Sequence, residues 1–238
     1  MSDPAAVSIE NLWKRFGFRR ALVGIDFEVT TGRCVAVLGP NGAGKSTLMR
    51  ILATRSRPTS GKVEVFGRDV RSDTVPARRD IGVVFHENCL RSDLTLDENL
   101  AFYAGLYGLD EPRPHADRLL EALGLTERRS DPIRTFSQGI LKRATLVRSL
   151  QHDPRLWLLD EPFSGLDPEG RAALAQLIRA ERDGGRTVIF ITHDIDRGLE
   201  LADDALLLRD GEVAAGGVEP VRRELAAAGR LPRMTNDE

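Results

Sequence analysis

The sequence predicts an α/β protein in which two β-rich segments flank a wholly helical one. The run "CVAVLG" at 34–39 is continuously apolar, which is typical of a strand buried on both faces. Strands return at "RLWLLDE" (155–161) and "TVIFITH" (187–193), separated by the helix-like segment 169–185. From 94 to 150 the periodicity is helical throughout, so the middle of the chain differs in character from both ends.

This order of elements predicts a single domain over residues 1–238. We expect residues 1–87 and 152–238 to fold together into one layered α/β core, because each β portion needs a covered face. Residues 88–151 are expected to form a helical lobe at the side of that core.

The core strands follow from apolar patterns and turn residues. "GIDFEV" at 24–29 alternates apolar and charged residues, as a half-buried antiparallel strand does, so an antiparallel β subdomain is expected near the N-terminus. "GKVEVFG" (61–67) and "IGVVF" (81–85) are further short strands. Residues 205–217 are predicted to form a hairpin, because they contain the turn pair Asp-Gly at 210–211.

The predicted lobe has three helix-like stretches, at 94–109, 114–125 and 140–150. In the last stretch, four apolar residues share one face and two basic residues point away from it: Ile140, Ala144, Val147 and Leu150, against Lys142 and Arg143.

Composition narrows the class of protein. A hydrophobic content of 41% and a charged content of 29% suit a globular chain with a core. The net charge of −2 gives no field that would attract nucleic acid, so no such partner is expected. Two cysteines, Cys34 and Cys89, are too few for a disulfide scaffold. No apolar run spans a bilayer and "MSDPAAVSIE" lacks the features of a signal peptide, which predicts a cytoplasmic chain that reaches a membrane only through a partner.

The segment "GPNGAGKST" at 39–47 contains the pattern G-x-x-x-x-G-K-S between a predicted strand and the predicted helix "KSTLMRILA". Glycines there let backbone N–H groups close around phosphates, while Lys45 supplies charge to the outer phosphates and Ser46 a ligand for Mg²⁺. This context favours a P-loop NTPase (RecA-like) core over a chance glycine-rich turn. The predicted nucleotide-binding residues are Gly39, Pro40, Asn41, Gly42, Ala43, Gly44, Lys45, Ser46 and Thr47.

Two carboxylates end the strand at 155–161. Asp160 at the end of a buried strand is placed to hold Mg²⁺ through water. Glu161 is expected to leave the strand in the opposite direction and to act on the attacking water as a general base. His193 ends the next strand at the same edge, where ligands of open α/β sheets bind, and is expected to contact the γ-phosphate and to position the water.

Five motifs, including "FSQGI" (136–140), "LWLLDEPFSGLD" (156–167) and "ITHD" (191–194), follow in an order that resembles the nucleotide-binding subunit of ABC transporters over nearly the whole chain. The resemblance implies ATP and Mg²⁺ as cofactors. It also implies a head-to-tail dimer with a second ATPase subunit, expected to be a second copy of this chain, in which Ser137 and Gly139 contact the nucleotide of the other subunit. Asp167 would lie at the dimer seam. Phe16 would stack on adenine, with core packing as the alternative.

Two positions depart from the family pattern. His86 stands where the family has a glutamine that senses Mg²⁺, so we take it as a candidate metal ligand and expect an altered pH or metal dependence. The alternative is that His86 only packs at a strand end. Gln138 and Ile140 replace the first glycine and the final glutamine of the family's signature motif.

The resemblance further implies an ATPase that powers a separate integral membrane permease from the cytoplasmic face of the cell membrane. The stretch "DLTLDENLAFYAGLYGL" (93–109) is similar to export-type members, and the loop 88–95 is where a permease would dock. Haem export for cytochrome c maturation is the favoured cargo, with drug, antibiotic or lipid export as alternatives. A soluble ABC ATPase acting on ribosomes or DNA, and a small-molecule P-loop kinase, are the other classes.

Overall fold

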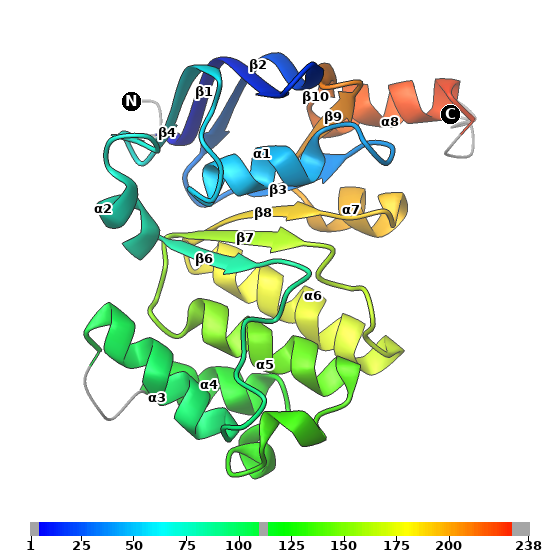
Figure 1. The fold of residues 1–238 in the computed structure, drawn as a ribbon. Helices are drawn as coiled ribbons and strands as arrows, with labels where there is room; N and C mark the ends of the chain where they lie inside the picture. Colours follow the sequence, from blue (N-terminus) through cyan, green and yellow to red (C-terminus); the bar gives the residue numbers. More distant parts are fainter. Residues whose placement is uncertain (1–4, 110–113, 230–238) are drawn as a thin grey trace.

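The computed structural model describes residues 5–109 and 114–229, and its strands form two sheets (Figure 1). The antiparallel sheet has the order β2-β1-β4-β5 and the larger sheet has the order β10-β9-β3-β8-β7-β6, in which β10 alone runs against its neighbour. The predicted α/β class with an antiparallel subdomain is thereby confirmed. The strands are β1 (Ala5–Phe16), β2 (Arg19–Thr30), β3 (Cys34–Leu38), β4 (Ser60–Val65), β5 (Arg68–Asp69), β6 (Ile81–Val84), β7 (Leu156–Asp160), β8 (Thr187–Ile191), β9 (Asp204–Arg209) and β10 (Glu212–Gly216).

Helix α1 (Lys45–Leu52) lies between the two sheets (Figure 1). Strand β3 is buried along its whole length, and its residues alternate between two separate cores. Val35 and Val37 pack with Met49 of α1 and with the antiparallel sheet, whereas Cys34 and Ala36 face the opposite core. The continuously apolar run at 34–39 is therefore a strand buried on both faces, as predicted.

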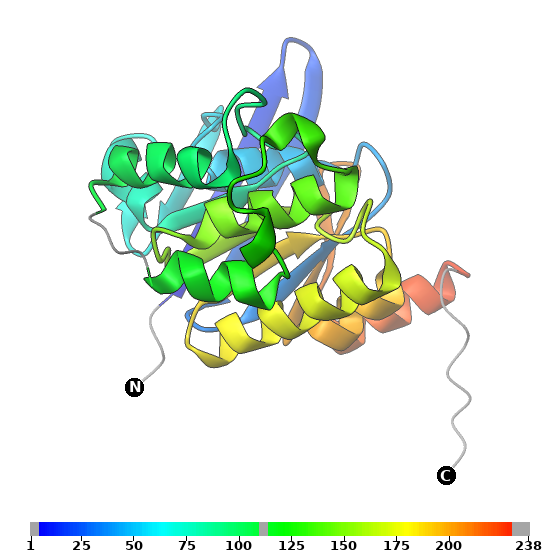
Figure 2. The ribbon, with the colours of Figure 1, turned by 90° about the horizontal axis from the view of Figure 1, so that it is seen from below.

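The second face of the larger sheet is covered by helices. Figure 2 shows from below how the green helices of the lobe and the yellow helix α6 (Pro168–Asp183) lie across it. Trp157 and Phe190 are the largest side chains buried there. Helices α7 (Ile195–Leu201) and α8 (Val218–Ala227) complete the core, and a short helix α2 (Thr74–Arg79) precedes β6.

Residues between β6 and β7 carry α3 (Leu96–Tyr107), α4 (Pro114–Ala122) and α5 (Gln138–Leu150), with two 3₁₀ turns between α4 and α5 (Thr126–Arg128 and Ile133–Thr135). Thr95 and Glu98 form a capping box at the start of α3, which satisfies two exposed backbone N–H groups. Arg129 donates to Asp97 of α3 at 3.0 Å and to Asp117 of α4 at 2.7 Å. These bonds join the helices of the lobe to one another.

The C-terminal half of α5 is fixed to the larger sheet. Trp157 Nε1 of β7 donates to Ser149 Oγ at 2.9 Å, and Arg148 donates to the Val83 carbonyl at 2.9 Å. A Cβ on Gly82 would lie 2.2 Å from the Ser149 carbonyl oxygen, so a residue without a side chain is required for this close approach. Lys142, nearly two turns before this contact, was expected on an outward face but is half-buried against the core.

The predicted hairpin at 205–217 is confirmed as β9 and β10, because Asp210 and Gly211 both have positive φ in the turn between them. Cys34 is buried, Cys89 is exposed, and neither forms a disulfide. Across residues 5–109 and 114–229 there is no helix with the length and apolar character needed to cross a membrane.

Candidate active site

Residues 39–44 form a tight loop between the end of β3 and the start of α1, and residues 45–47 begin the helix. Gly39 and Gly44 have φ values of 140° and 104°, and a Cβ would lie 2.1 Å from the Leu208 carbonyl at the first and 2.7 Å from the Ala21 carbonyl at the second. Side chains are therefore excluded at both positions, which leaves the backbone N–H groups free to surround an anion at the helix N-terminus.

Lys45 is the first residue of α1 and only 6% exposed. Its Nζ donates to the carbonyl oxygens of Gly39 at 2.7 Å and Pro40 at 2.9 Å, so the ammonium closes its own loop. Burial lowers the pKa of Lys45, and the charges of Glu161 and Asp160 oppose this shift. Phosphate oxygens could replace the two carbonyls, since they are stronger acceptors for an ammonium.

Asp160 is the last residue of β7, and Glu161 follows it outside the strand. We expected the two side chains to diverge by strand alternation, but Glu161 has a positive φ of 49°, so the alternation has already ended there. Both carboxylates consequently line the same two cavities. Burial raises the pKa of Glu161, with His193 opposing this rise.

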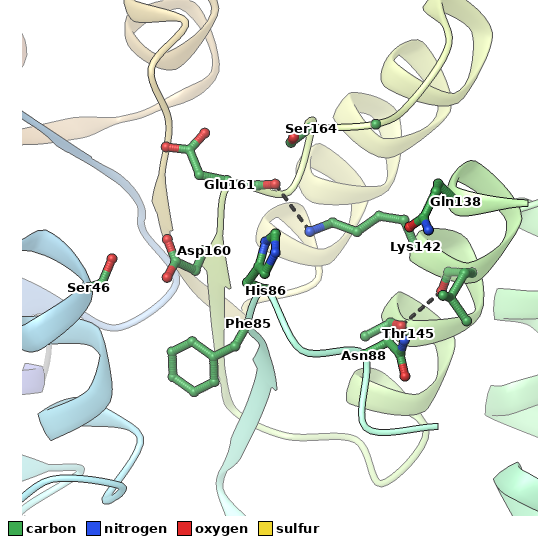
Figure 3. Close-up of a pocket in the computed structure, with 12 residues that line it drawn as sticks. Ser46, Phe85, His86, Asn88, Gln138, Lys142, Thr145, Asp160, Glu161 and Ser164 are labelled. Atoms are coloured by element: carbon green, nitrogen blue, oxygen red, sulfur yellow. Dashed lines mark hydrogen bonds between the residues drawn. The ribbon is translucent and has the colours of Figure 1, made fainter. Parts of the chain in front are cut away.

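Two adjoining cavities meet at Ser46, Asp160 and Glu161. The smaller, of about 260 Å³, lies over the glycine-rich loop and also includes Phe16, Arg19, Asn41, Gly42, Gly44, Lys45, Thr47 and His193. The larger, of about 460 Å³, lies between the core and α5 and includes His86, Asn88, Gln138, Lys142 and Ser164 (Figure 3). A nucleoside triphosphate has a base, a sugar and a phosphate chain, and the first cavity offers an aromatic ring at one end and cationic and N–H donors at the other.

Phe16 is 54% exposed at the end of β1, with Lys14 Nζ 4.7 Å from the centre of its ring. Core packing, the alternative role for Phe16, is therefore wrong. His86 is also exposed, and it lines the larger cavity together with Asp160 and Ser46. The alternative that His86 only packs at a strand end is likewise wrong.

The described residues contain no group of three or more His, Cys, Asp or Glu side chains placed to hold a metal by themselves. The hydroxyl of Ser46 and the carboxylate of Asp160 nevertheless line one cavity beside the phosphate loop. Mg²⁺ in phosphate-transfer sites is usually held by one or two protein oxygens, with phosphate and water completing the shell. The donors present here fit that kind of site.

Ser137 and Gly139 are not brought to the loop of their own chain. Ser137 is the N-cap of α5, where its Oγ accepts from the Ile140 N–H at 3.4 Å, and its side chain is exposed. Neither residue lines either of the two cavities that the described part of the chain forms around Ser46. Gln138, by contrast, faces the larger cavity from the first turn of α5 (Figure 3).

Lys142 and Arg19 were not identified from the sequence as site residues. Lys142 follows Gln138 by four positions, so the two share one helix face, and this spacing was the available signal. Arg19 begins β2, and its guanidinium would lie 3.7 Å from a Cβ on Gly42. Arg19 lies at the phosphate loop because β1 and β2 form a hairpin, in which Arg19 pairs with Phe16.

A family model described as ABC transporter matches residues 22–164. The daunorubicin resistance ATP-binding protein DrrA3 of Streptomyces coeruleorubidus is 37% identical, over 91% of this chain and 69% of that protein. The linearmycin resistance ATP-binding protein LnrL of Bacillus subtilis is 36% identical, over 88% of this chain and 68% of that protein. The Nod factor export ATP-binding protein I of Ralstonia nicotianae is 34% identical, over 89% of this chain and 66% of that protein.

Solved structures agree with these sequence matches. The ATP-binding subunit of an ABC transporter superposes with a TM-score of 0.84 at 28% identity, covering 94% of both chains. The ATP-binding cassette MJ0796, in a dimeric post-hydrolysis state bound to ADP and Pi, superposes with a TM-score of 0.80 at 27% identity, covering 88% of this chain and 97% of that one.

The fold and the phosphate loop define a P-loop nucleotide-hydrolysing protein. Within that class, the chain belongs to the ABC transporter ATP-binding family, and it is an ATPase domain that binds ATP.

Proposed function

We propose that this chain is the ATP-hydrolysing subunit of an ABC exporter and that it drives a separate membrane permease from the cytoplasmic face of the membrane. The observation that carries this proposal is the convergence of Lys45, Glu161 and His193 on one cavity over the phosphate loop, in a chain of this family. The resistance and export names of the relatives support the direction of transport.

In the proposed reaction, water attacks the γ-phosphorus and ADP leaves. Glu161 accepts the proton of that water, because its carboxylate lies beside the loop and His193 Nε2 orients it from 3.0 Å. Lys45 and the loop N–H groups stabilise the charge on the transferring phosphoryl group. Ser46 and Asp160, with His86 at the same cavity, would hold Mg²⁺, which supplies further neutralisation of phosphate charge.

The site is proposed to be complete only in a head-to-tail dimer. Ser137 and Gly139 stand at the exposed start of α5, away from the cavity of their own chain. In the proposed dimer they contact the γ-phosphate held by the loop of a second copy, and Asp167 lies at the seam. The solved dimers of a related cassette support this arrangement.

The permease is proposed to dock on the loop 88–95 and the adjoining face of α3. Phe102 and Leu106 of α3 are exposed large apolar side chains, which a monomeric surface rarely groups without a partner. For the cargo, the sequence favoured haem, but the names of the relatives support an amphipathic drug or antibiotic instead. An ATPase acting on ribosomes or DNA is the alternative class, and the net charge of −2 does not favour it.

The test uses tagged Glu161→Gln protein as bait in detergent-solubilised membranes with Mg-ATP, because loss of the base should prolong the ATP-bound state. We expect a polytopic membrane protein to be captured. A second substitution Leu106→Asp should abolish that capture, whereas Val75→Asp, at an exposed apolar residue of α2, should leave it intact.

Capture of ribosomal or DNA-associated proteins alone, insensitive to Leu106→Asp, would overturn the transport proposal. Once the permease is identified, the reconstituted complex distinguishes the cargoes. Stimulation of its ATPase rate by anthracyclines supports drug export, and stimulation by haem alone supports the haem alternative.

A further inference from the structure

Lys142 reaches from the helical lobe into the catalytic cavity and contacts the main chain of Glu161. Its Nζ donates to the Glu161 carbonyl oxygen at 3.1 Å. Figure 3 shows the lysine extended from α5 along the cavity, with the Glu161 carbonyl pointing towards it and the Glu161 carboxylate pointing the other way. The lobe therefore holds Glu161 by its backbone carbonyl, while the Glu161 side chain points towards the phosphate loop.

The backbone of Glu161 needs such a contact because it is strained. A φ of 49° in a residue with a side chain costs on the order of 1–2 kcal/mol, and it persists only where the surroundings impose it. The Glu161 N–H donates to the Ile191 carbonyl at 3.1 Å, and the Glu161 carbonyl accepts from the Ser164 N–H at 3.3 Å. The ammonium of Lys142 adds a second donor to the Glu161 carbonyl, at 3.1 Å, and hydrogen bonds from charged donors are stronger than those from neutral ones.

Burial of the Lys142 ammonium is unfavourable, so other interactions must compensate for its desolvation. The side chain is half-buried, and burial lowers its pKa while Asp160 and Glu161 oppose that shift. A methionine would fill the same space without the desolvation penalty of an ammonium. The compensating interactions are the hydrogen bond to the Glu161 carbonyl and the attraction to the carboxylates of Asp160 and Glu161.

We propose that Lys142 is a positioning residue for ATP hydrolysis: it fixes the Glu161 carbonyl and thereby aims the Glu161 carboxylate at the attacking water. This inference rests on the proposed role of Glu161 as the base. Lys142 also lies five residues after Ser137, which is about 7.5 Å along α5. The helix that would meet the nucleotide of the other subunit therefore also holds the base of its own site.

The test compares three substitutions in the full chain. Lys142→Met removes the ammonium and keeps the length of the side chain, and Lys142→Arg keeps a charged donor. Arg143→Met is the matched control, because Arg143 is the next residue of α5 and donates to the Leu123 carbonyl within the lobe at 3.3 Å. Lys142→Gln serves as a second variant if Lys142→Met does not fold.

We expect Lys142→Met to lower kcat by about 10- to 100-fold, because small misplacements of a catalytic group have effects of this size. The KM for ATP should stay within about twofold, since ground-state binding is not involved. Lys142→Arg should recover much of kcat, and Arg143→Met should leave kcat and KM unchanged. A kcat of Lys142→Met equal to wild type would overturn the inference.

A double substitution separates positioning of the base from a general structural effect. If Lys142 acts through Glu161, single-turnover hydrolysis by Lys142→Met/Glu161→Gln should be no slower than by Glu161→Gln alone. If Lys142→Met lowers the single-turnover rate of Glu161→Gln by the same factor as it lowers the rate of wild type, the inference is also overturned. If Glu161→Gln itself hydrolyses ATP at the wild-type rate, the assignment of the base fails instead, and that result is distinguishable from the others.

Discussion

His193 Nε2 lies 3.0 Å from Glu161 Oε1, so the residues that follow β7 and β8 meet beside the phosphate loop. The contact arises from the register of the two parallel strands, in which Asp160 is paired with Ile191. This carboxylate oxygen is buried, and His193 Nε2 is the group that lies against it among the described residues. In the proposed reaction, this pair would hold the attacking water beside the γ-phosphate.

The first prediction concerns His193. We expect His193→Ala to lower kcat by about 10²–10³-fold, because in the proposed reaction the imidazole that contacts Glu161 also donates to the γ-phosphate. ATP binding, measured by fluorescence titration, should change little, since Lys45 and the loop N–H groups remain. An unchanged kcat would mean that the contact with Glu161 has no part in hydrolysis.

The second prediction concerns the exposed ring of Phe16. Phe16→Ala should weaken ATP binding by about 5- to 150-fold, because stacking of a base on an aromatic side chain contributes about 1–3 kcal/mol. Phe18→Ala is the matched control, since Phe18 lies in the same hairpin, is fully exposed and lines neither cavity around Ser46. Equal effects of the two substitutions on the ATP Kd would contradict the assignment of Phe16.

The third prediction concerns His86. An imidazole nitrogen binds Mn²⁺ well relative to Mg²⁺, whereas an amide oxygen suits Mg²⁺. His86→Gln should therefore lower the ratio of the Mn²⁺-supported to the Mg²⁺-supported ATPase rate. The ratio is measured at saturating ATP for wild type and variant in parallel. An identical ratio would show that His86 does not approach the metal.

The fourth prediction concerns acid stability and His152, which is stacked on Tyr107 with ring centres 3.8 Å apart. The pKa of His152 is lowered from 6.5 to about 4, mainly by burial and also by Arg148 and Arg186, while a contact with the Ile81 carbonyl and the charge of Asp153 oppose the shift. Below its ordinary pKa the unfolded chain takes up a proton that the folded chain does not. The free energy of unfolding should therefore decrease as the pH falls from about 6.5 to about 4, and His152 accounts for at most about 3 kcal/mol of this decrease.

His152→Gln removes that titration, so its urea-unfolding free energy should fall less than that of wild type between about pH 7.5 and about pH 5. Tyr107→Phe is the control, because it keeps the ring stacked on His152 and should keep the acid sensitivity. Parallel losses in all three proteins would show that other groups dominate.

Much of the fold was predictable because its signals are local. The apolar runs within β3, β7 and β8 are short and end at a glycine or at polar residues, which is typical of strands buried on both faces. The phosphate loop was predictable for the same reason, since its glycines, lysine and serine are consecutive in sequence. The helices α2 and α7 were not predicted, because six or seven residues give too little periodicity to recognise.

The site residues that escaped prediction depend on contacts between distant segments. The direction of the Glu161 side chain follows from a left-handed turn held by Ile191 and Lys142, and strand alternation predicts the wrong geometry there. The helical pattern of α5 predicted that Lys142 points away from the core, and it could not show that the carbonyl of another segment lies within reach of this side chain. Such a contact is visible only once α5 is packed on β6 and β7.

In the proposed dimer, each ATPase site is shared between two copies of this chain, and complementation of two inactive variants is the most direct test of that sharing. Lys45→Ala should disable the phosphate loop and Ser137→Arg the start of α5, so each variant alone should be inactive. In an equimolar mixture, half of the dimers pair the intact loop of one copy with the intact α5 of the other. Each such dimer has one working site of two, so we expect recovery of about a quarter of the wild-type ATPase rate. A mixture no more active than its separate components would contradict the shared site.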